Sequence, residues 1–131
     1  MSQPPQIVLD TTVLIDALRN RKQRRILLAG LVASGQELVT STICIAELYG
    51  GLRPGEEGAT QALLAGLEWI PVSAAIAAEA GNLKAEFRRQ GQTRSITDMV
   101  IAATALISGG SVATDNLRDF QIQGLKLFHL P

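Results

Sequence analysis

Hydrophobic positions along this chain fall into two alternating patterns, short runs rich in Val, Ile and Leu and longer stretches with helical spacing. The short runs predict strands, and the longer stretches predict helices between them. The expected strands are 7–9, 37–41, 69–72, 111–114 and 125–128. The expected helices are one that begins at 11 or 12 and carries apolar positions up to 18, followed by 21–33, 43–48, 61–67, 74–89 and 97–107. Strands that alternate with helices predict a three-layer α/β/α domain with a central, mainly parallel sheet.

Two of the helical stretches, 74–89 and 97–107, differ in how their apolar residues are arranged. In 74–89, Ile76, Ala80, Leu83 and Phe87 form one stripe, which predicts a helix that buries a single face. The stretch 97–107 is apolar nearly all round, so we expect this helix to lie inside the molecule. The chain has 131 residues and shows no repeat or linker. This is the usual size of one compact domain, so we expect residues 1–131 to form a single domain.

Composition and charge exclude several classes of protein. Hydrophobic residues make up 47% of the chain and aromatic residues 4%, which excludes general disorder and requires an aliphatic core. Twelve basic and twelve acidic residues cancel, so a strongly basic nucleic-acid coat is excluded, although a local basic patch is not. The single cysteine, Cys44, and the single histidine, His129, exclude an internal disulfide and a Cys/His metal cluster. No leader or membrane span is visible, so we expect a soluble, cytoplasmic protein.

Several acidic residues lie at the ends of expected elements or among apolar neighbours. Asp10 ends the first expected strand, and Asp115 and Asn116 follow the strand 111–114. Asp98 lies in the first turn of the buried helix, and Glu47 lies inside an otherwise apolar helix. Open parallel sheets bind their ligands at the carboxyl ends of the strands. We therefore expect Asp10, Glu47 and Asp98 to converge in one acidic pocket at that edge.

Each of these acids also has an ordinary structural role available, as a helix cap, a solvent-facing side chain or a turn residue. A functional site is favoured because four separate elements would direct acids to one edge of the sheet. Two carboxylates about 5 Å apart repel by roughly 3 kcal/mol at an effective dielectric constant of about 20. A cluster of three or four carboxylates therefore needs protons or a divalent cation to offset this repulsion. Oxygen donors without His or Cys indicate Mg²⁺ or Mn²⁺, ions that support phosphodiester cleavage.

Four segments resemble the motifs of PIN-domain nucleases and occur in the same order along the chain. They are IVLDTTVLID at 7–16, STICIAELYGG at 41–51, ITDMVIAATAL at 96–106 and TDNLRDF at 114–120. One such motif alone is a weak signal. Four in the same order, spanning nearly the whole chain, are a strong one. The resemblance is closest to VapC-type toxins of toxin–antitoxin pairs, and it implies a PIN-like α/β/α fold.

The resemblance implies a Mg²⁺-dependent endoribonuclease that cleaves RNA, with Mn²⁺ as a substitute, and the toxin of a type II toxin–antitoxin pair. It implies that Asp10, Glu47 and Asp98 coordinate the metal, and that Thr12 positions Asp10 or the attacking water.

The closing motif departs from the family pattern, because its usual acid-or-amide position falls on Asn116, next to Asp115. Asp115 is the candidate fourth metal ligand, and Asn116 and Asp119 are the alternatives for the fourth position of the site. Cys44 stands where the family often has threonine, and we expect it to affect packing only.

Basic residues form two groups despite the zero net charge. The first contains Arg19, Arg21, Lys22, Arg24 and Arg25, and the second contains Lys84, Arg88, Arg89 and Arg94. The second group leads into the Asp98 helix, so it is a candidate for holding RNA phosphates beside the metal. A solvated helix face is the alternative interpretation of both groups.

Apolar helix faces predict partner surfaces. The helical stretches 26–32 and 61–67 are expected to keep exposed hydrophobic surface, which would mark a partner site. The resemblance supplies two candidates, a second copy of the chain in a two-fold homodimer and a cognate antitoxin with a basic side chain that reaches the acids. Trp69 is expected in the core or in an interface, and His129 away from the chemistry.

Other function classes fit this sequence less well. A phosphatase with a phospho-aspartate has a second Asp where this chain has Thr12, and a receiver-like signalling domain has an acid where Leu9 precedes Asp10. No G-x-G-x-x-G run indicates a dinucleotide site, and a lone histidine disfavours a catalytic triad. A catalytically silent PIN-like domain that only binds a partner stays open, since Asn116 brings no charge. A Mg²⁺-dependent phosphatase is a less favoured alternative.

Overall fold

The central sheet is parallel throughout. The computed structural model describes residues 6–131, and within them five strands form one sheet in the order β3-β2-β1-β4-β5. Every neighbouring pair in this sheet runs parallel, and Val8 at the centre pairs with Val39 on one side and Val112 on the other. The strands are β1 (Gln6–Leu9), β2 (Glu37–Ser41), β3 (Glu68–Ile70), β4 (Ser111–Ala113) and β5 (Lys126–Phe128). Their carboxyl ends therefore share one edge of the sheet.

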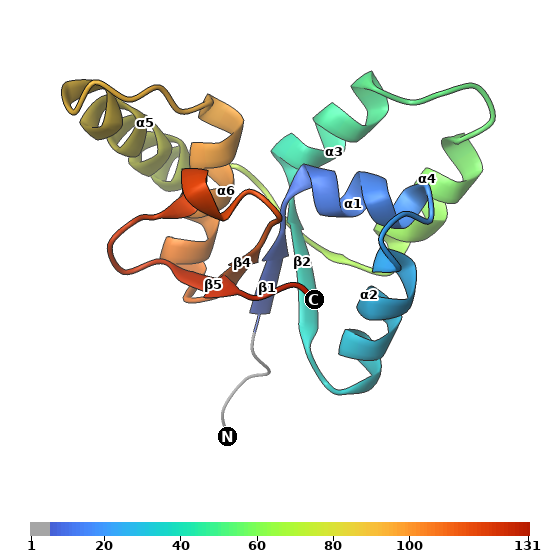
Figure 1. Ribbon diagram of the computed structural model, residues 1–131. Coiled ribbons are helices and arrows are strands. Elements are labelled where there is room, and N and C mark those ends of the chain that lie inside the picture. Colours follow the sequence, from blue (N-terminus) through green and yellow to red (C-terminus); the bar gives the residue numbers. More distant parts are fainter. Residues whose placement is uncertain (1–5) are drawn as a thin grey trace.

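Helices cover both faces of this sheet, so the predicted α/β/α architecture is confirmed. In Figure 1, α5 and α6 lie on one side of the strands and α1, α2 and α4 on the other, while α3 follows the carboxyl end of β2. The helices are α1 (Thr11–Leu18), α2 (Arg24–Ala33), α3 (Thr42–Gly50), α4 (Glu57–Ala65), α5 (Ala74–Arg89), α6 (Ile96–Ser108) and the short η1 (Leu117–Phe120). None of the helices in residues 6–131 combines the length and the apolarity needed to cross a membrane.

The core is aliphatic, as the composition requires. Val8, Leu9, Val39 and Val112 of the central strands are fully buried, and the side chains of α6 pack over them. Every residue of α6 from Met99 to Ala105 is buried, which explains why this helix is apolar on all sides. Large-to-small changes in such a core typically cost about 2–5 kcal/mol. The carboxyl edge of the sheet is therefore held rigidly in place.

Helix α5 follows the predicted single stripe. Ile76 and Ala80 are buried against α6, and Leu83 and Phe87 are partly buried further along the same face. The hydroxyl of Ser73 accepts a hydrogen bond from the backbone N–H of Ile76 and so fixes the start of the helix. The helix then ends at Arg89, as expected from the sequence.

Several element boundaries differ from the expectations. The second helix begins at Arg24 and not at 21, because Asn20, Lys22 and Gln23 adopt left-handed φ angles of 53°, 52° and 56°. The fourth helix begins earlier than expected, at Glu57. Strand β3 ends at Ile70, before a proline that has no N–H to donate.

Of the two places expected for Trp69, the core is excluded, and an interface stays a prediction. Its side chain lies on the edge strand β3 and is 51% exposed. The indole N–H donates to the carbonyl of Leu64 at 2.8 Å, which anchors one end of the ring while the rest faces outward.

Candidate active site at the carboxyl edge of the sheet

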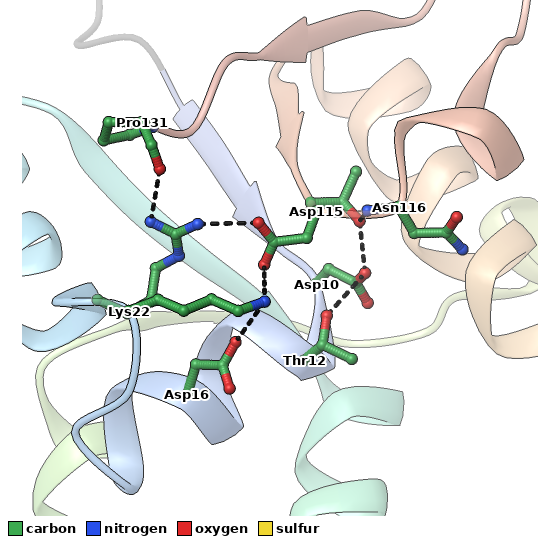
Figure 2. Close-up of polar contacts among 9 residues, drawn as sticks. Asp10, Thr12, Asp16, Lys22, Asp115, Asn116 and Pro131 are labelled. Atoms are coloured by element: carbon green, nitrogen blue, oxygen red, sulfur yellow. Dashed lines mark hydrogen bonds and ion pairs between the residues drawn. The ribbon is translucent and has the colours of Figure 1, made fainter.

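Asp10 lies between β1 and α1 with its side chain turned away from the helix end. It occupies the cap position of α1, yet its carboxylate makes no capping hydrogen bond. Instead, Oδ2 accepts hydrogen bonds from the hydroxyls of Thr114 at 2.7 Å and Thr12 at 3.3 Å. Figure 2 shows the Asp10 and Thr12 side chains pointing toward each other. The side chain of Asp10 therefore does not cap the helix, which was its alternative structural role.

The environment of Asp10 raises the pKa of its carboxyl above the ordinary value. Burial is the largest influence and raises the pKa of this carboxyl, which is only 5% exposed, and the negative charge of Glu47 raises the pKa further. Hydrogen bonds from Thr114, from the Thr11 backbone and from Thr12 pull the pKa back without restoring it. A buried acid with a raised pKa and no cationic partner is typical of a functional site.

Glu47 reaches the same region from α3. Its Oε1 accepts a hydrogen bond from the Thr11 hydroxyl at 2.7 Å, which ties α3 to the start of α1. The residue is exposed, so the carboxylate stays hydrated on its open side. Its charge acts on both Asp10 and Asp98, since it contributes to the raised pKa of each.

Asp98 enters from the opposite face of the sheet, in the first turn of α6. Ser95 caps this helix by accepting a hydrogen bond from the Asp98 N–H at 3.0 Å, which fixes where the aspartate stands. Partial burial is the main reason that the pKa of Asp98 is raised, and the charges of Asp10, Asp119 and Glu47 add to it. Three separate elements therefore bring acids within electrostatic reach of Asp98.

We call Asp10, Glu47, Asp98 and Asp119 the acidic cluster. Within residues 6–131, no basic side chain forms an ion pair with Asp10, Glu47 or Asp98. Hard, uncompensated carboxylate oxygens are the donors that Mg²⁺ and Mn²⁺ prefer, so the chemistry of this set fits such an ion. As the side chains stand, no three acidic, His or Cys groups in the described residues are close enough to share one ion. The exposed Glu47 has rotatable bonds with which to close the distance once a cation offsets the repulsion.

Asp115, the candidate fourth metal ligand, makes ion pairs instead. Its Oδ1 lies 2.8 Å from Nη2 of Arg24, and its Oδ2 lies 3.5 Å from Nζ of Lys22. Lys22 also lies 3.6 Å from Asp16, and Arg24 donates to the carbonyl of Pro131. Figure 2 shows the Asp115 carboxylate turned toward Lys22, while Asp10 lies on the other side. We call Asp16, Lys22, Arg24 and Asp115 the ion-pair cluster.

The other two candidates for the fourth position bond to each other. The side-chain amide of Asn116 donates to Oδ2 of Asp119 at 2.6 Å, and its backbone N–H donates to the Thr114 hydroxyl. Asp119 is the candidate whose negative charge contributes to the raised pKa of Asp98. It is also near a cation, since Nε of Arg94 lies 3.6 Å from its Oδ1. The electrostatic influence on Asp98 therefore favours Asp119 over Asp115 as a supplement to the three principal acids.

Most of the first basic group serves the fold. Arg19 pairs with Glu56 at 3.2 Å, and Arg25 donates to the carbonyls of Ala17 and Leu18 at the end of α1. Lys22 and Arg24 belong to the ion-pair cluster. These four side chains are thus engaged in contacts within the chain and are not a set of free phosphate ligands, although Lys22 and Arg25 remain exposed.

Cys44 takes no part in the chemistry. It is fully buried, and burial is the main influence that raises the pKa of its thiol to about 11, so it stays neutral. Its Sγ lies 3.9 Å from the carbonyl of Leu9, which agrees with a packing role.

Residue-by-residue reasoning overlooked several hydroxyls that orient the acids. Thr11 holds Glu47 and Thr114 holds Asp10. Among the hydroxyls at these strand ends, only Thr12 has a role predicted from the sequence. A Thr next to each strand-end Asp was the available signal, because hydroxyls are the usual donors to a buried carboxylate.

Comparison with known proteins agrees with this arrangement. The family model described as PIN domain matches residues 7–122. Ribonuclease VapC19 of Mycobacterium tuberculosis is 33% identical over 113 residues, which cover 86% of this chain and 90% of that protein. Ribonuclease VapC10 of the same species is 32% identical over 125 residues, which cover 95% of this chain and 86% of that protein.

Solved structures show the same fold. The crystal structure of VapBC2 from Rickettsia felis bound to a promoter DNA fragment contains a chain with a TM-score of 0.82 and 25% identity, covering 96% of this chain and 99% of that one. A VapBC-1 structure from nontypeable Haemophilus influenzae gives a TM-score of 0.77 at 25% identity, covering 94% and 96%. The match of fold, motifs and sequence places this chain in the PIN-domain family, among its VapC members.

Proposed function

We propose that this protein is a Mg²⁺-dependent endoribonuclease and the toxin of a type II toxin–antitoxin pair, with Mn²⁺ able to replace Mg²⁺. The observation that carries the proposal is that three carboxylates, Asp10, Glu47 and Asp98, lie within electrostatic reach of one another without a cationic partner in the described residues. The relatives that match most of the chain are named ribonucleases, which supports RNA as the substrate.

Each residue of the site has a distinct role in this proposal. Asp10, Glu47 and Asp98 would hold the metal, which supplies Lewis-acid stabilisation of the phosphodiester and a more acidic attacking water. Thr12 and Thr114 orient the Asp10 carboxylate through hydrogen bonds, and Thr11 does the same for Glu47. Asp119 adds negative charge beside Asp98, and Asn116 restricts the Asp119 side chain with a hydrogen bond.

The proposal is tested by incubating labelled RNA and p-nitrophenyl phosphate in parallel with Mg²⁺, with Mn²⁺ and with excess EDTA. We expect RNA cleavage with either metal, no cleavage in EDTA and no release of p-nitrophenol. Release of p-nitrophenol without RNA cleavage would favour a phosphatase. Metal-supported binding of RNA or of a partner with no cleavage would favour a catalytically silent domain.

A cognate antitoxin is the proposed partner, and an apolar groove supports it. The groove measures about 640 Å³ and is lined by apolar side chains of α1, α2 and α4, among them Leu28, Val32, Ala62 and Leu63. It lies on the two helices expected to keep exposed hydrophobic surface, and Val32 is 52% exposed. One structural neighbour is a chain of a toxin–antitoxin complex from Klebsiella pneumoniae. An apolar antitoxin segment fits this groove, with a basic side chain directed to the acidic cluster.

Two matched variants test the groove. Ala62→Glu places a charge among its apolar side chains, whereas Ala78→Glu places the same charge on an exposed position of α5. We expect antitoxin affinity, measured by calorimetry, to fall at least about tenfold in the first variant only. The reason is that a bound antitoxin segment would bury the new charge without a partner, which is costly. Equal affinities would exclude this groove as the antitoxin site.

A two-fold homodimer is the proposed assembly of the isolated chain. Several large apolar side chains are at least partly open to solvent, including Ile26, Tyr49 and Trp69. Two-fold dimers are the commonest closed assemblies, and such surface favours one. Light scattering at micromolar concentration should report twice the chain mass, and a mass of 13.9 kDa would contradict the dimer.

A further inference from the structure

The second basic group builds a small cationic hollow beside the acidic cluster. The hollow, between the end of α5 and the loop that leads to α6, has a volume of about 50 Å³ and is lined by Lys84, Arg88, Gln92, Thr93 and Arg94. This is several times the space of roughly 10–15 Å³ that a single water needs. It suits a small group with several oxygen atoms and is too small for a nucleobase with its sugar.

The walls of the hollow are fixed by contacts within the chain. The guanidinium of Arg94 lies over the Phe87 ring, 4.4 Å from its centre, and donates to Gln92 Oε1 at 3.0 Å and to the Thr93 carbonyl at 3.1 Å. The ammonium of Lys84 donates to the backbone carbonyl of Arg94 and so ties the loop to α5. Fixed donors of this kind bind an anion without a large loss of side-chain entropy.

The positive charge of this hollow is largely uncompensated. Within residues 6–131, neither Lys84 nor Arg88 forms an ion pair, and Arg94 approaches only Asp119, at 3.6 Å. Arg89, next in the chain, is instead bound to Glu86 at 2.7 Å. Three cations around one small space repel each other, and an anion removes that repulsion.

Arg94 connects the hollow to the acidic cluster. It lines the hollow and lies beside Asp119, whose charge acts on Asp98. A strand that presents one phosphodiester to the carboxylates can therefore place a flanking phosphate in the hollow.

We infer that Lys84, Arg88 and Arg94 form a subsite for a flanking phosphate of the RNA strand. This inference rests on the proposed ribonuclease function and names the residues that hold the substrate beside the reacting group. A phosphate is favoured over a carboxylate because several donors from three cations match its several oxygens.

Arg88→Gln tests the subsite, with Arg89→Gln as the matched control. The side chain of Arg88 is exposed and has no hydrogen bond or ion pair in the described residues, so its removal leaves the loop and Arg94 in place. Both variants change the net charge equally, and Arg89→Gln also frees Glu86. Because the change of net charge is the same, long-range electrostatics are matched in the two variants. Only Arg88→Gln removes a cation from the hollow.

The first measurement is binding of labelled single-stranded RNA in EDTA, followed by fluorescence anisotropy over a range of salt concentrations. We expect Arg88→Gln to bind about tenfold more weakly than Arg89→Gln and to lower the salt slope by about 0.7, the value for one lost phosphate contact on a single strand. Equal affinities and equal slopes would overturn the subsite. Binding of an acidic peptide at this position without RNA binding would overturn it as well.

The second measurement is the rate of cleavage with Mg²⁺. We expect Arg88→Gln to raise KM about tenfold with kcat unchanged, since a flanking contact acts equally on bound substrate and transition state. A lower kcat at unchanged KM would contradict the assignment. If wild-type protein does not cleave RNA, the proposed function fails, while the binding measurement in EDTA still decides the subsite.

Discussion

Two aspartates follow neighbouring strands of the same sheet, Asp10 after β1 and Asp115 after β4, yet their surroundings are opposite. Asp115 is held by Arg24 at 2.8 Å and Lys22 at 3.5 Å. Asp10 receives only hydroxyl and backbone hydrogen bonds and faces the negative charge of Glu47. The comparison shows that position at a strand end does not decide the surroundings of an aspartate, and the lack of charge compensation makes Asp10 the better candidate for a metal ligand.

The two clusters also differ in what they contribute to stability. In the ion-pair cluster, Arg24 is 3% exposed, so Asp115 offsets a buried charge that would otherwise be costly. In the acidic cluster, burial and mutual repulsion raise the pKa values of Asp10 and Asp98, so the folded state holds them as charged groups only at a cost. A protein keeps such a destabilising group where a ligand or a reaction requires it.

The largest expected effect separates the two clusters by activity. Asp98→Asn should lower Mg²⁺-dependent RNA cleavage by at least about 100-fold, because it removes a metal-binding charge with little change of shape. Asp115→Asn makes the same chemical change in the ion-pair cluster and should leave the rate within about threefold of wild type. Circular dichroism checks that both variants are folded. A comparable loss in both variants would abolish the distinction.

Removing Arg24 should separate the clusters by stability. Arg24→Met leaves the Asp115 carboxylate without its main partner, and we expect a loss of about 2 kcal/mol in the free energy of unfolding. This is less than the 3–5 kcal/mol typical of a fully buried pair, because the Asp115 side chain is 32% exposed. Lys22→Met, at a side chain that is 56% exposed, should cost less than about 0.5 kcal/mol. Urea denaturation measures both, and a larger loss in Lys22→Met would contradict the assignment.

A third variant examines how Asp10 is oriented. Thr114→Val removes the hydroxyl that donates to Asp10 at 2.7 Å, and we expect Mn²⁺ affinity to fall about tenfold in calorimetry. The control is Thr104→Val, since Thr104 is equally buried but donates only to the carbonyl of Val100 in its own helix. Its metal affinity should match that of wild type. Equal losses of affinity would mean that packing, and not the hydrogen bond, sets the effect.

The smallest expected effect is a pH dependence of stability. Because the pKa of Asp98 is raised in the folded state, the folded protein binds this proton more tightly than the unfolded chain does. The resulting stabilisation is present below the unfolded pKa of about 4 and is lost as pH rises through the raised folded value. Metal-free wild type should therefore lose on the order of 1 kcal/mol relative to Asp98→Asn between about pH 4 and pH 7.

Thermal melts of both proteins across this pH range measure that difference. The control is saturating Mg²⁺, which should raise the midpoint of wild type far more than that of the variant. A difference that stays constant from acid to neutral pH would show that Asp98 is not under electrostatic strain.

Much of the fold follows from local pattern. The strand at 37–41 and the helix at 74–89 have the predicted bounds, and α6 is buried as its all-round apolar sequence indicates. Boundaries shifted where backbone conformation, and not hydrophobicity, decides, as in the left-handed residues before Arg24. A polar, basic run next to an apolar helix gives no sequence signal for that change of conformation.

By itself, the sequence determined the order of strands and helices, the aliphatic core and the identity of the acids at the element ends, since each depends on neighbouring residues. Only the tertiary structure decided which acids are compensated. Arg24 and Asp115 are 91 residues apart, and Thr114 and Asp10 are 104 apart. Ion pairing, desolvation and repulsion depend on distance in space and not on separation along the chain. Asp10 and Asp115 therefore look alike along the chain and become different groups only when the sheet brings their neighbours to them.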